Sequence, residues 1–155
     1  KKNIESNLIL KMLFSESAPL YNNLYNNNLI NDSFSSDTLA SYSYFATLIG
    51  GEVKNVDATV KAILEKLEEI KATGLSEEDF ISTKKAAFGR QIKSFNSLET
   101  IANGFSSNFF SKIGAFDFID VYDQITIASL NERLVQMFNS NYAISEVEPL
   151  GVQGA

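Results

Sequence analysis

The 155-residue sequence contains no cysteine and no histidine. Without cysteine, the chain can form neither a disulfide nor a thiolate metal site. Without histidine, it lacks the most common metal ligand, general base and catalytic-triad partner. A zinc site built from this chain alone would need carboxylates only, which is unusual for zinc. The composition therefore argues against catalysis by this chain on its own.

Long apolar runs and dense positive charge are also missing. No apolar run approaches the roughly 20 residues of a membrane-spanning helix. The net charge is −6, which argues against a nucleic-acid partner, because phosphates are neutralised by dense basic patches. The best basic cluster has a helical spacing, and we interpret it as the solvated face of a helix. It consists of Lys84, Lys85, Arg90 and Lys93.

Size and termini suggest how the chain is organised. A chain of 155 residues is long enough to bury a core and most often forms one domain. It opens with Lys1-Lys2-Asn3, without an initiator Met or the apolar region of a signal peptide. We therefore expect residues 1–155 to be a single domain excised from a larger protein.

Apolar residues spaced by three and four predict helices over much of the chain. Two successive helices after Gly74, separated by a break at Asn96-Ser97, carry the longest apolar surface, so we expect the rest of the domain to fold against them. Ser76 and Thr126 are the expected N-caps of the helices that follow them. The predicted helical segments are about 3–15, 18–28, 56–73, 77–95, 98–113, 116–122 and 127–138.

Alternating side chains predict strands in two places. Residues 39–49 alternate with a period of two and carry apolar residues on both faces, so we expect one strand inside a sheet, with a hairpin as the alternative for this region. A short strand near Phe34 is expected before it, and a last strand at 142–147. The expected fold class is α+β, with a small, mainly antiparallel sheet packed against a layer of helices.

Two further patterns have a structural and a functional interpretation. The acidic run Glu77–Asp79 could bind a metal, but it complements the dipole at a helix N-terminus better. An aromatic series could line a small-molecule pocket of an unrelated α+β domain, but aromatic residues at helical spacing are more often core. The series consists of Phe105, Phe109, Phe110, Phe116 and Phe118.

Three segments, in this order, resemble the pitrilysin/insulysin family of zinc metallopeptidases, which includes the mitochondrial processing peptidases and the core proteins of respiratory complex III. Residues 18–34 resemble the family's short helix and following strand. Residues 73–85, which begin Thr-Gly-Leu-Ser-Glu-Glu-Asp-Phe, resemble the start of its long helix. Residues 122–130 resemble the entry to its last helix, and residues 95–103 look closest to a bacterial cytosolic branch.

The resemblance implies two homologous halves, only one of which is catalytic. The catalytic half carries a His-x-x-Glu-His helix that binds zinc and supplies the general base. This chain has no histidine, so it resembles most of the second half, without its first strand. That half can supply an Arg and, seven residues later, a Tyr that hold substrate. The aligned positions here are Tyr25 and Asp32, which match neither.

The resemblance therefore implies a non-catalytic half-domain that encloses a substrate chamber and helps position peptides, with Tyr25 and Asp32 as candidate substrate-positioning residues. It implies no metal ligand and no cofactor in this chain, and zinc in the catalytic half of the parent or a partner subunit. The expected partners are that catalytic half and a peptide substrate, with a homodimer allowed, in the bacterial cytoplasm. The alternative is a structural or assembly subunit of the same fold without peptidase activity.

Overall fold

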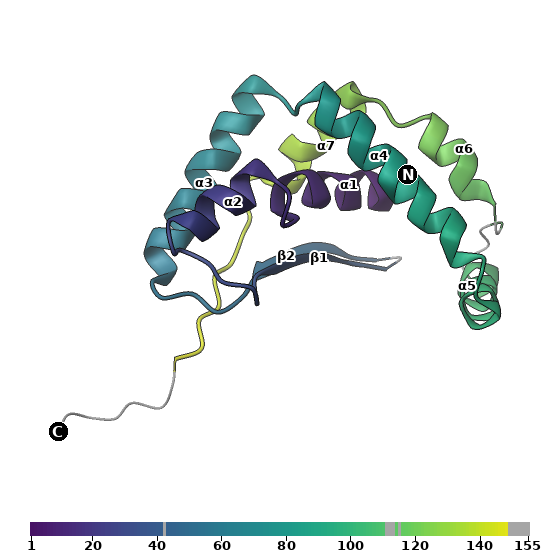
Figure 1. The fold of residues 1–155 in the computed structure, drawn as a ribbon, viewed down its shortest axis with the longest axis horizontal. Helices are drawn as coiled ribbons and strands as arrows, with labels where there is room; N and C mark the ends of the chain where they lie inside the picture. Colours follow the sequence, from purple (N-terminus) through teal and green to yellow (C-terminus); the bar gives the residue numbers. More distant parts are fainter. Residues whose placement is uncertain (42, 111–113, 115, 149–155) are drawn as a thin grey trace.

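The computed structural model of the chain describes residues 1–41, 43–110, 114 and 116–148, with the backbone alone for 107–110. Its described part is an α+β arrangement of seven helices and one two-stranded sheet (Figure 1), which confirms the expected fold class. The elements are α1 (Lys2–Phe14), α2 (Pro19–Asn26), β1 (Ser35–Ala40), β2 (Phe45–Gly50), α3 (Val56–Thr73), α4 (Glu77–Ser94), α5 (Leu98–Phe110), α6 (Asp117–Asp123) and α7 (Ile127–Met137).

Helix α1 is the centre of the packing. It contacts α2, α4, α7 and β1, and eight of its 13 residues are buried. In Figure 1 it crosses the molecule above the β-hairpin. Its apolar residues are spread around the helix, as is typical of a helix covered on every side. The core therefore forms around α1, with further buried side chains from α2, α4 and α7.

The prediction that the helices after Gly74 organise the fold is wrong. Helix α4 buries only Phe80 and Ala87, and every residue from Leu98 to Ser106 of α5 is exposed. Their long apolar series has little to pack against within the described residues. Apolar periodicity shows which face of a helix is apolar, but it does not show which other elements pack against that face.

Helix α7 joins α1 to the hairpin through Arg133. Arg133 Nε donates a hydrogen bond to Ser6 Oγ at 3.0 Å, and the guanidinium lies 4.4 Å from the centre of the Phe45 ring. Ser6 is completely buried and donates in turn to the carbonyl of Lys2. Leu130 and Leu134 fill the buried side of α7.

The sheet is a single antiparallel hairpin, in which Ser35 pairs with Gly50 and Ala40 with Phe45. The prediction of one strand over 39–49 is wrong, because the chain reverses between Ala40 and Phe45. Paired residues lie on the same face of an antiparallel sheet. Even-numbered residues of β1 therefore share a face with odd-numbered residues of β2. A single strand would instead place all even-numbered residues on one face. The short strand expected near Phe34 begins one residue later, at Ser35.

The predicted strand at 142–147 is also wrong: this segment forms no strand in the structure. Its apolar side chains Tyr142, Ile144 and Val147 are exposed, and the sheet that the structure describes contains only β1 and β2. The tail from Pro149 lies outside the described residues. Tyr42 of the predicted strand and Ile113 of the apolar series lie outside them as well.

Side chains cap the N-termini of three helices, α3, α4 and α7. Ser76 Oγ accepts a hydrogen bond from Asp79 N–H at 3.2 Å, and Asn55 Oδ1 accepts one from Ala58 N–H. Thr126 and Ser129 form a reciprocal capping box at the start of α7. These side chains satisfy N–H groups that have no partner inside a helix. The helix starts were therefore predictable from local sequence.

The basic cluster is only partly a solvated face. Lys85, Arg90 and Lys93 are exposed, as predicted. Lys84 is half-buried instead: its Nζ donates to the carbonyl of Ile125 at 2.8 Å and lies 5.5 Å from the centre of the Phe80 ring. It connects α4 to the segment before α7.

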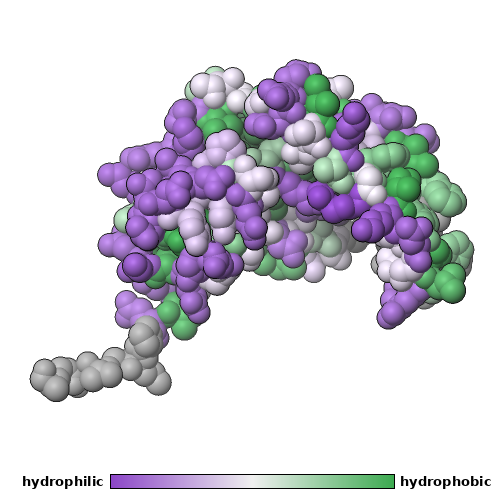
Figure 2. Space-filling view, in the orientation of Figure 1, coloured by the Kyte–Doolittle hydropathy of each residue, from purple (hydrophilic) through white to green (hydrophobic). Residues whose placement is uncertain are grey.

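The aromatic series is only partly core. Phe118 is half-buried and packs beside Phe88 and Tyr122. Phe105 and Phe116 are exposed, so the core interpretation is wrong for these two, and the side chains of Phe109 and Phe110 lie outside the described part. Figure 2 shows hydrophobic residues gathered at the end of the molecule where Figure 1 places α5 and α6.

Candidate functional site

Helix α2 presents Tyr25, one of the two sequence-predicted site residues. Pro19 starts this helix at a position where its missing N–H costs no hydrogen bond. Tyr25 lies in the last turn and is 43% exposed. Its ring stacks on that of Tyr21, one turn earlier, with the ring centres 6.0 Å apart and an interplanar angle of 14°. Tyr21 is buried, so it fixes one face of Tyr25 while the other side remains accessible.

The turn after α2 carries Asp32. Asn28 ends the helix in the left-handed conformation, with φ of 55°. Asn31 Oδ1 then accepts hydrogen bonds from the backbone N–H and the hydroxyl of Ser33, at 2.9 and 2.6 Å. Phe34 N–H donates to the carbonyl of Asn31 and closes the turn. Asp32 lies in this turn and is exposed.

Tyr25 lines a cavity of about 390 Å³, which we call the α2 cavity. Its other walls come from the turn after α2 and from the segment that follows β2. Ser33 Oγ accepts a hydrogen bond from Glu52 N–H at 2.7 Å and holds these two segments together. Asp32 is not among the lining residues. The lining residues are Tyr25, Asn28, Leu29, Ile30, Asn31, Glu52, Val53 and Lys54.

Gly51 allows the two walls of the α2 cavity to approach closely. A Cβ atom at this position would lie 2.6 Å from the Cα and 2.8 Å from the backbone nitrogen of Phe34. Backbone atoms cannot move aside as the end of a flexible side chain can. Only glycine therefore fits here without displacing the chain.

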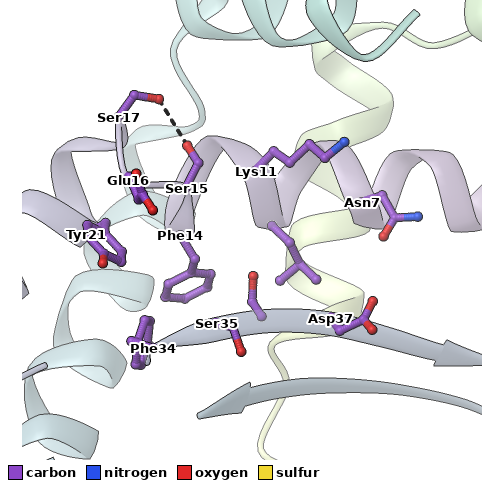
Figure 3. Close-up of a pocket in the computed structure, with 12 residues that line it drawn as sticks. Asn7, Lys11, Phe14, Ser15, Glu16, Ser17, Tyr21, Phe34, Ser35 and Asp37 are labelled. Carbon is purple, nitrogen blue, oxygen red and sulfur yellow. Dashed lines mark hydrogen bonds between the residues drawn. The ribbon is translucent and has the colours of Figure 1, made fainter. Parts of the chain in front are cut away.

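A second cavity, of about 630 Å³, lies between α1, α2 and β1, and we call it the α1–β1 cavity (Figure 3). Three aromatic rings form one side: Phe34 lies 6.1 Å from Phe14 and 6.2 Å from Tyr21, measured between ring centres. Leu10 and polar side chains from α1, β1 and the 15–17 loop complete the lining. The polar residues are Asn7, Lys11, Ser15, Glu16, Ser17, Ser35, Ser36 and Asp37.

Residues near both cavities affect the pKa of Tyr21. Burial raises the pKa of the Tyr21 phenol, and the negative charges of Glu16 and Asp32 act in the same direction, followed by Tyr25. Burial lowers the pKa of Lys11, and the positive charge of Arg90 adds to this effect. Tyr25 thus stacks on a buried phenol whose pKa the charge of Asp32 also raises, and of these two predicted residues Tyr25 lines the α2 cavity.

Tyr21, Phe14 and Phe34 are the cavity residues that sequence reasoning missed. The spacing of Tyr21 and Tyr25 by four residues on a helix is a local signal for their stacking. Phe14 and Phe34 are 20 positions apart and meet only after α2 folds back. Nothing in the local sequence indicates that contact.

The donors of this chain do not fit a zinc ion. The whole sequence lacks histidine and cysteine, and within the described ranges no three acidic residues come together in a way that could hold a metal. Among the helices that the structure describes, none is long and apolar enough to span a membrane. The acidic run Glu77–Asp79 lies in the first turn of α4, where negative charge is stabilised.

These features define an α+β domain that presents cavities and whose sequence has no histidine or cysteine to bind zinc. Comparison with known proteins gives its family. Residues 1–87 match the family model described as "Peptidase M16 inactive domain". The chain belongs to the M16 peptidase family and corresponds to its inactive domain. This is the zinc-metallopeptidase family indicated by the resemblance, and the non-catalytic half-domain is confirmed.

One curated relative is the "Uncharacterized zinc protease YmfH" of Bacillus subtilis (strain 168). It is 32% identical to the chain over 127 residues. The match covers 82% of this chain and 29% of that protein. The chain therefore spans less than a third of the length of this relative.

Solved structures show the same fold. A protein from Alicyclobacillus acidocaldarius, described as M16-like, superposes with a TM-score of 0.80 at 23% identity, and the match covers 86% of this chain and 32% of that one. A domain from Bordetella parapertussis, described as the inactive peptidase domain of a zinc protease, gives a TM-score of 0.77 at 15% identity, and the match covers 98% of this chain and 87% of that one.

Proposed function

We propose that this chain is one half-domain of a larger zinc metallopeptidase, in which it encloses the substrate chamber and helps position an extended peptide. The observation that carries the proposal is the match to the inactive domain by a chain that contains no histidine or cysteine. The catalytic half, in the same polypeptide or in a partner subunit, would supply the zinc and the general base. Water activated by the metal would then attack the peptide bond.

Within this proposal, Tyr25 donates a hydrogen bond from its phenol to a peptide carbonyl. Its position at the rim of the α2 cavity and its stacking on buried Tyr21 support this role. A ring held on one face keeps its hydroxyl in a narrow range of positions, so little rotational freedom is lost when a peptide binds.

Asp32 would act by charge in the same proposal. Its carboxylate is exposed in the turn after α2, outside the lining of the α2 cavity. A negative charge beside the cavity would disfavour peptides with acidic residues at the nearby position. Asp32 would therefore affect which peptides bind, without contacting the peptide bond that is cleaved.

The experiment is peptide cleavage by the longer protein that contains this chain. Wild type is compared with Tyr25→Phe, which keeps the stacked ring but removes the hydroxyl, and with Asp32→Asn. We expect Tyr25→Phe to lower kcat/KM about tenfold, equivalent to about 1.4 kcal/mol. Asp32→Asn should improve cleavage of acidic peptides relative to neutral ones. A longer protein that cleaves no extended peptide would contradict the proposal.

A structural or assembly subunit without peptidase activity is the second candidate function. It is favoured by the aligned substrate-holding positions, which carry Tyr25 and Asp32 instead of Arg and Tyr. The two candidates differ in the rest of the protein. An assembly subunit would lack a His-x-x-Glu-His helix and would remain bound to a partner without cleaving peptides.

The proposed location is the bacterial cytoplasm, and the proposed partners are the catalytic half and a peptide. The relative from Bacillus subtilis supports a bacterial origin, and the cytoplasmic location remains a prediction. A second copy of the chain is the other partner consistent with the family resemblance. Cell fractionation and the mass of the purified longer protein would test the location and the stoichiometry.

A further inference from the structure

Thr59 is a buried polar residue that the proposed function does not yet use. It lies in the first turn of α3 and is 4% exposed. Its hydroxyl oxygen lies 2.9 Å from the carbonyl oxygen of Leu29 and 2.9 Å from that of Asn55. Leu29 lines the α2 cavity, whereas Thr59 does not. The hydroxyl therefore links α3 to one wall of this cavity from outside the lining.

Of the two carbonyls, that of Leu29 depends more on the hydroxyl. A threonine hydroxyl has one proton, so it donates fully to one acceptor at a time. The carbonyl of Asn55 already accepts the backbone N–H of Thr59 at 3.1 Å. The carbonyl of Leu29, a half-buried residue, has the Thr59 hydroxyl as its donor within the described residues. Removing the hydroxyl would leave this carbonyl unpaired, which is costly where water has little access.

The end of α2 connects Leu29 to Tyr25 through two backbone hydrogen bonds. Leu29 N–H donates to the carbonyl of Leu24 at 3.0 Å, and Asn28 N–H donates to the carbonyl of Tyr25 at 2.9 Å. With Asn28 in the left-handed conformation, these two bonds form a Schellman motif. Leu29 is therefore held at its N–H by α2 and at its carbonyl by α3, and Tyr25 belongs to the helical turn that this motif closes.

Helix α3 also continues the opposite wall of the α2 cavity. That wall is formed by residues 52–54, and Asn55, which caps α3, follows it directly. Helices α2 and α3 are in contact, and Figure 1 shows them side by side. The Thr59 hydroxyl thus joins the wall that follows α2 to the helix that follows the other wall. This hydrogen bond fixes the separation of the two walls and, through the end of α2, the position of Tyr25.

We propose that Thr59 is a positioning residue for the α2 cavity, whose hydroxyl holds Leu29 and thereby the Tyr25 phenol where a bound peptide meets it. This inference rests on the proposed function, in which Tyr25 donates a hydrogen bond to a peptide carbonyl. Thr59 does not touch the peptide, because it lies outside the lining of the cavity. Without its hydroxyl, the end of α2 is no longer tied to α3, and a small displacement of a group that positions substrate lowers the reaction rate.

Peptide cleavage by the longer protein tests the role of the hydroxyl with two substitutions. Thr59→Val replaces the hydroxyl by a methyl group, whereas Thr59→Ser keeps the hydroxyl and removes the methyl group. We expect Thr59→Val to lower kcat/KM about fivefold and Thr59→Ser to stay within about twofold of wild type. Wild-type cleavage by Thr59→Val would overturn the inference. Equal losses in both variants would also overturn it, because side-chain packing rather than the hydroxyl would then be responsible.

A double-mutant cycle shows whether Thr59 acts through Tyr25. In a longer protein that already carries Tyr25→Phe, the phenol hydroxyl that Thr59 is proposed to position is absent. Adding Thr59→Val should then change kcat/KM by less than about twofold, since the effects of coupled residues do not add. An undiminished loss in the Tyr25→Phe background would contradict the inference, because Thr59 would then act independently of Tyr25.

Hydrogen exchange in the longer protein gives a measurement that does not depend on cleavage. We expect the Asn28 and Leu29 amides to exchange about tenfold faster in Thr59→Val than in wild type or Thr59→Ser. The Phe138 amide, which is bonded to the carbonyl of Leu134 at the end of α7, is the control and should be unchanged. Unchanged exchange at Leu29, or an equal acceleration at Phe138, would overturn the inference.

The two measurements separate the inference from the proposed function. A wild-type protein that cleaves no extended peptide would contradict the proposed function, whatever the exchange rates. A wild-type protein that cleaves peptides, together with exchange at Leu29 that does not respond to Thr59→Val, would overturn the positioning role alone.

Discussion

Helices α1 and α5 have the same length, 13 residues, and opposite surroundings. Helix α1 is buried around most of its circumference, although its apolar residues mark no single face. Helix α5 has a clear apolar stripe, yet every residue from Leu98 to Ser106 is exposed. The difference shows that the position of a helix in the fold decides how many of its side chains are buried. The apolar periodicity of the helix does not decide it.

The comparison predicts very different costs for similar truncations. Leu8→Ala on α1 removes a side chain that is 1% exposed, and it should lower the free energy of unfolding by about 2–5 kcal/mol. Leu98→Ala on α5 removes one that is 85% exposed, and its effect should stay within about 0.5 kcal/mol. Urea denaturation of the 155-residue chain measures both. Equal costs would mean that α5 is packed as closely as α1.

The region around the α2 cavity contains a close backbone contact, between Gly51 and Phe34. Gly51→Ala would force these two segments apart and should lower the free energy of unfolding by about 1–3 kcal/mol. Gly50→Ala is the matched control, because its added Cβ would meet no atom within 4 Å. Differential scanning calorimetry of the two variants checks the difference. A Gly51→Ala variant as stable as Gly50→Ala would show that the walls move apart freely.

A smaller effect is expected at the start of α7, which packs on α1. Thr126→Ala removes one side of the capping box and leaves the Ser129 N–H without its partner. We expect a loss of about 1 kcal/mol. Thr100→Ala in the exposed α5 removes a threonine that caps no helix and is the control for the loss of a hydroxyl. Chemical denaturation should separate the two, and similar midpoints would contradict the role of the cap.

The smallest expected effect is a pH dependence at Tyr21. The folded-state pKa of its phenol is raised above the ordinary value of 10.0. Stability from the neutral phenol is therefore fully present below pH 10.0 and is lost as the pH rises through the folded-state pKa. Tyr21→Phe should lose less stability than wild type between pH 9 and pH 11. Tyr142→Phe, at an exposed tyrosine, is the control, and the same alkaline loss in all three proteins would contradict the assignment.

Local signals predicted the helices well. Ser76 and Thr126 are the two expected N-caps, and the structure places a side-chain cap at each. The cap and the first turn are set by residues within four positions of one another, so the sequence alone contains the information. The predicted segment 18–28 ends at Asn28, which adopts the left-handed conformation two residues after the end of α2.

Long-range features were not predictable. The reversal between Ala40 and Phe45 changes which residues share a face, and alternating serines and tyrosines do not mark it. The central position of α1 depends on α7, which lies more than 100 residues later in the chain. The approach of Phe14 to Phe34 likewise needs the whole turn through α2.

The candidate site was predicted in part. Tyr25, aligned by resemblance, lines the α2 cavity, whereas Asp32 lies outside its lining. Their functional roles remain predictions, tested by the cleavage experiment above. The α1–β1 cavity was not predicted, because its walls come from α1, α2 and β1, and their approach is a property of the fold.

The most direct test of the central claim, that this is the non-catalytic half of a zinc metallopeptidase, is the zinc content of two preparations. One is the longer protein, together with any co-purifying partner, and the other is the 155-residue chain. The account predicts about one zinc per catalytic half in the first preparation and none in the second. A first preparation without zinc, or zinc retained by a chain that lacks histidine and cysteine, would contradict it.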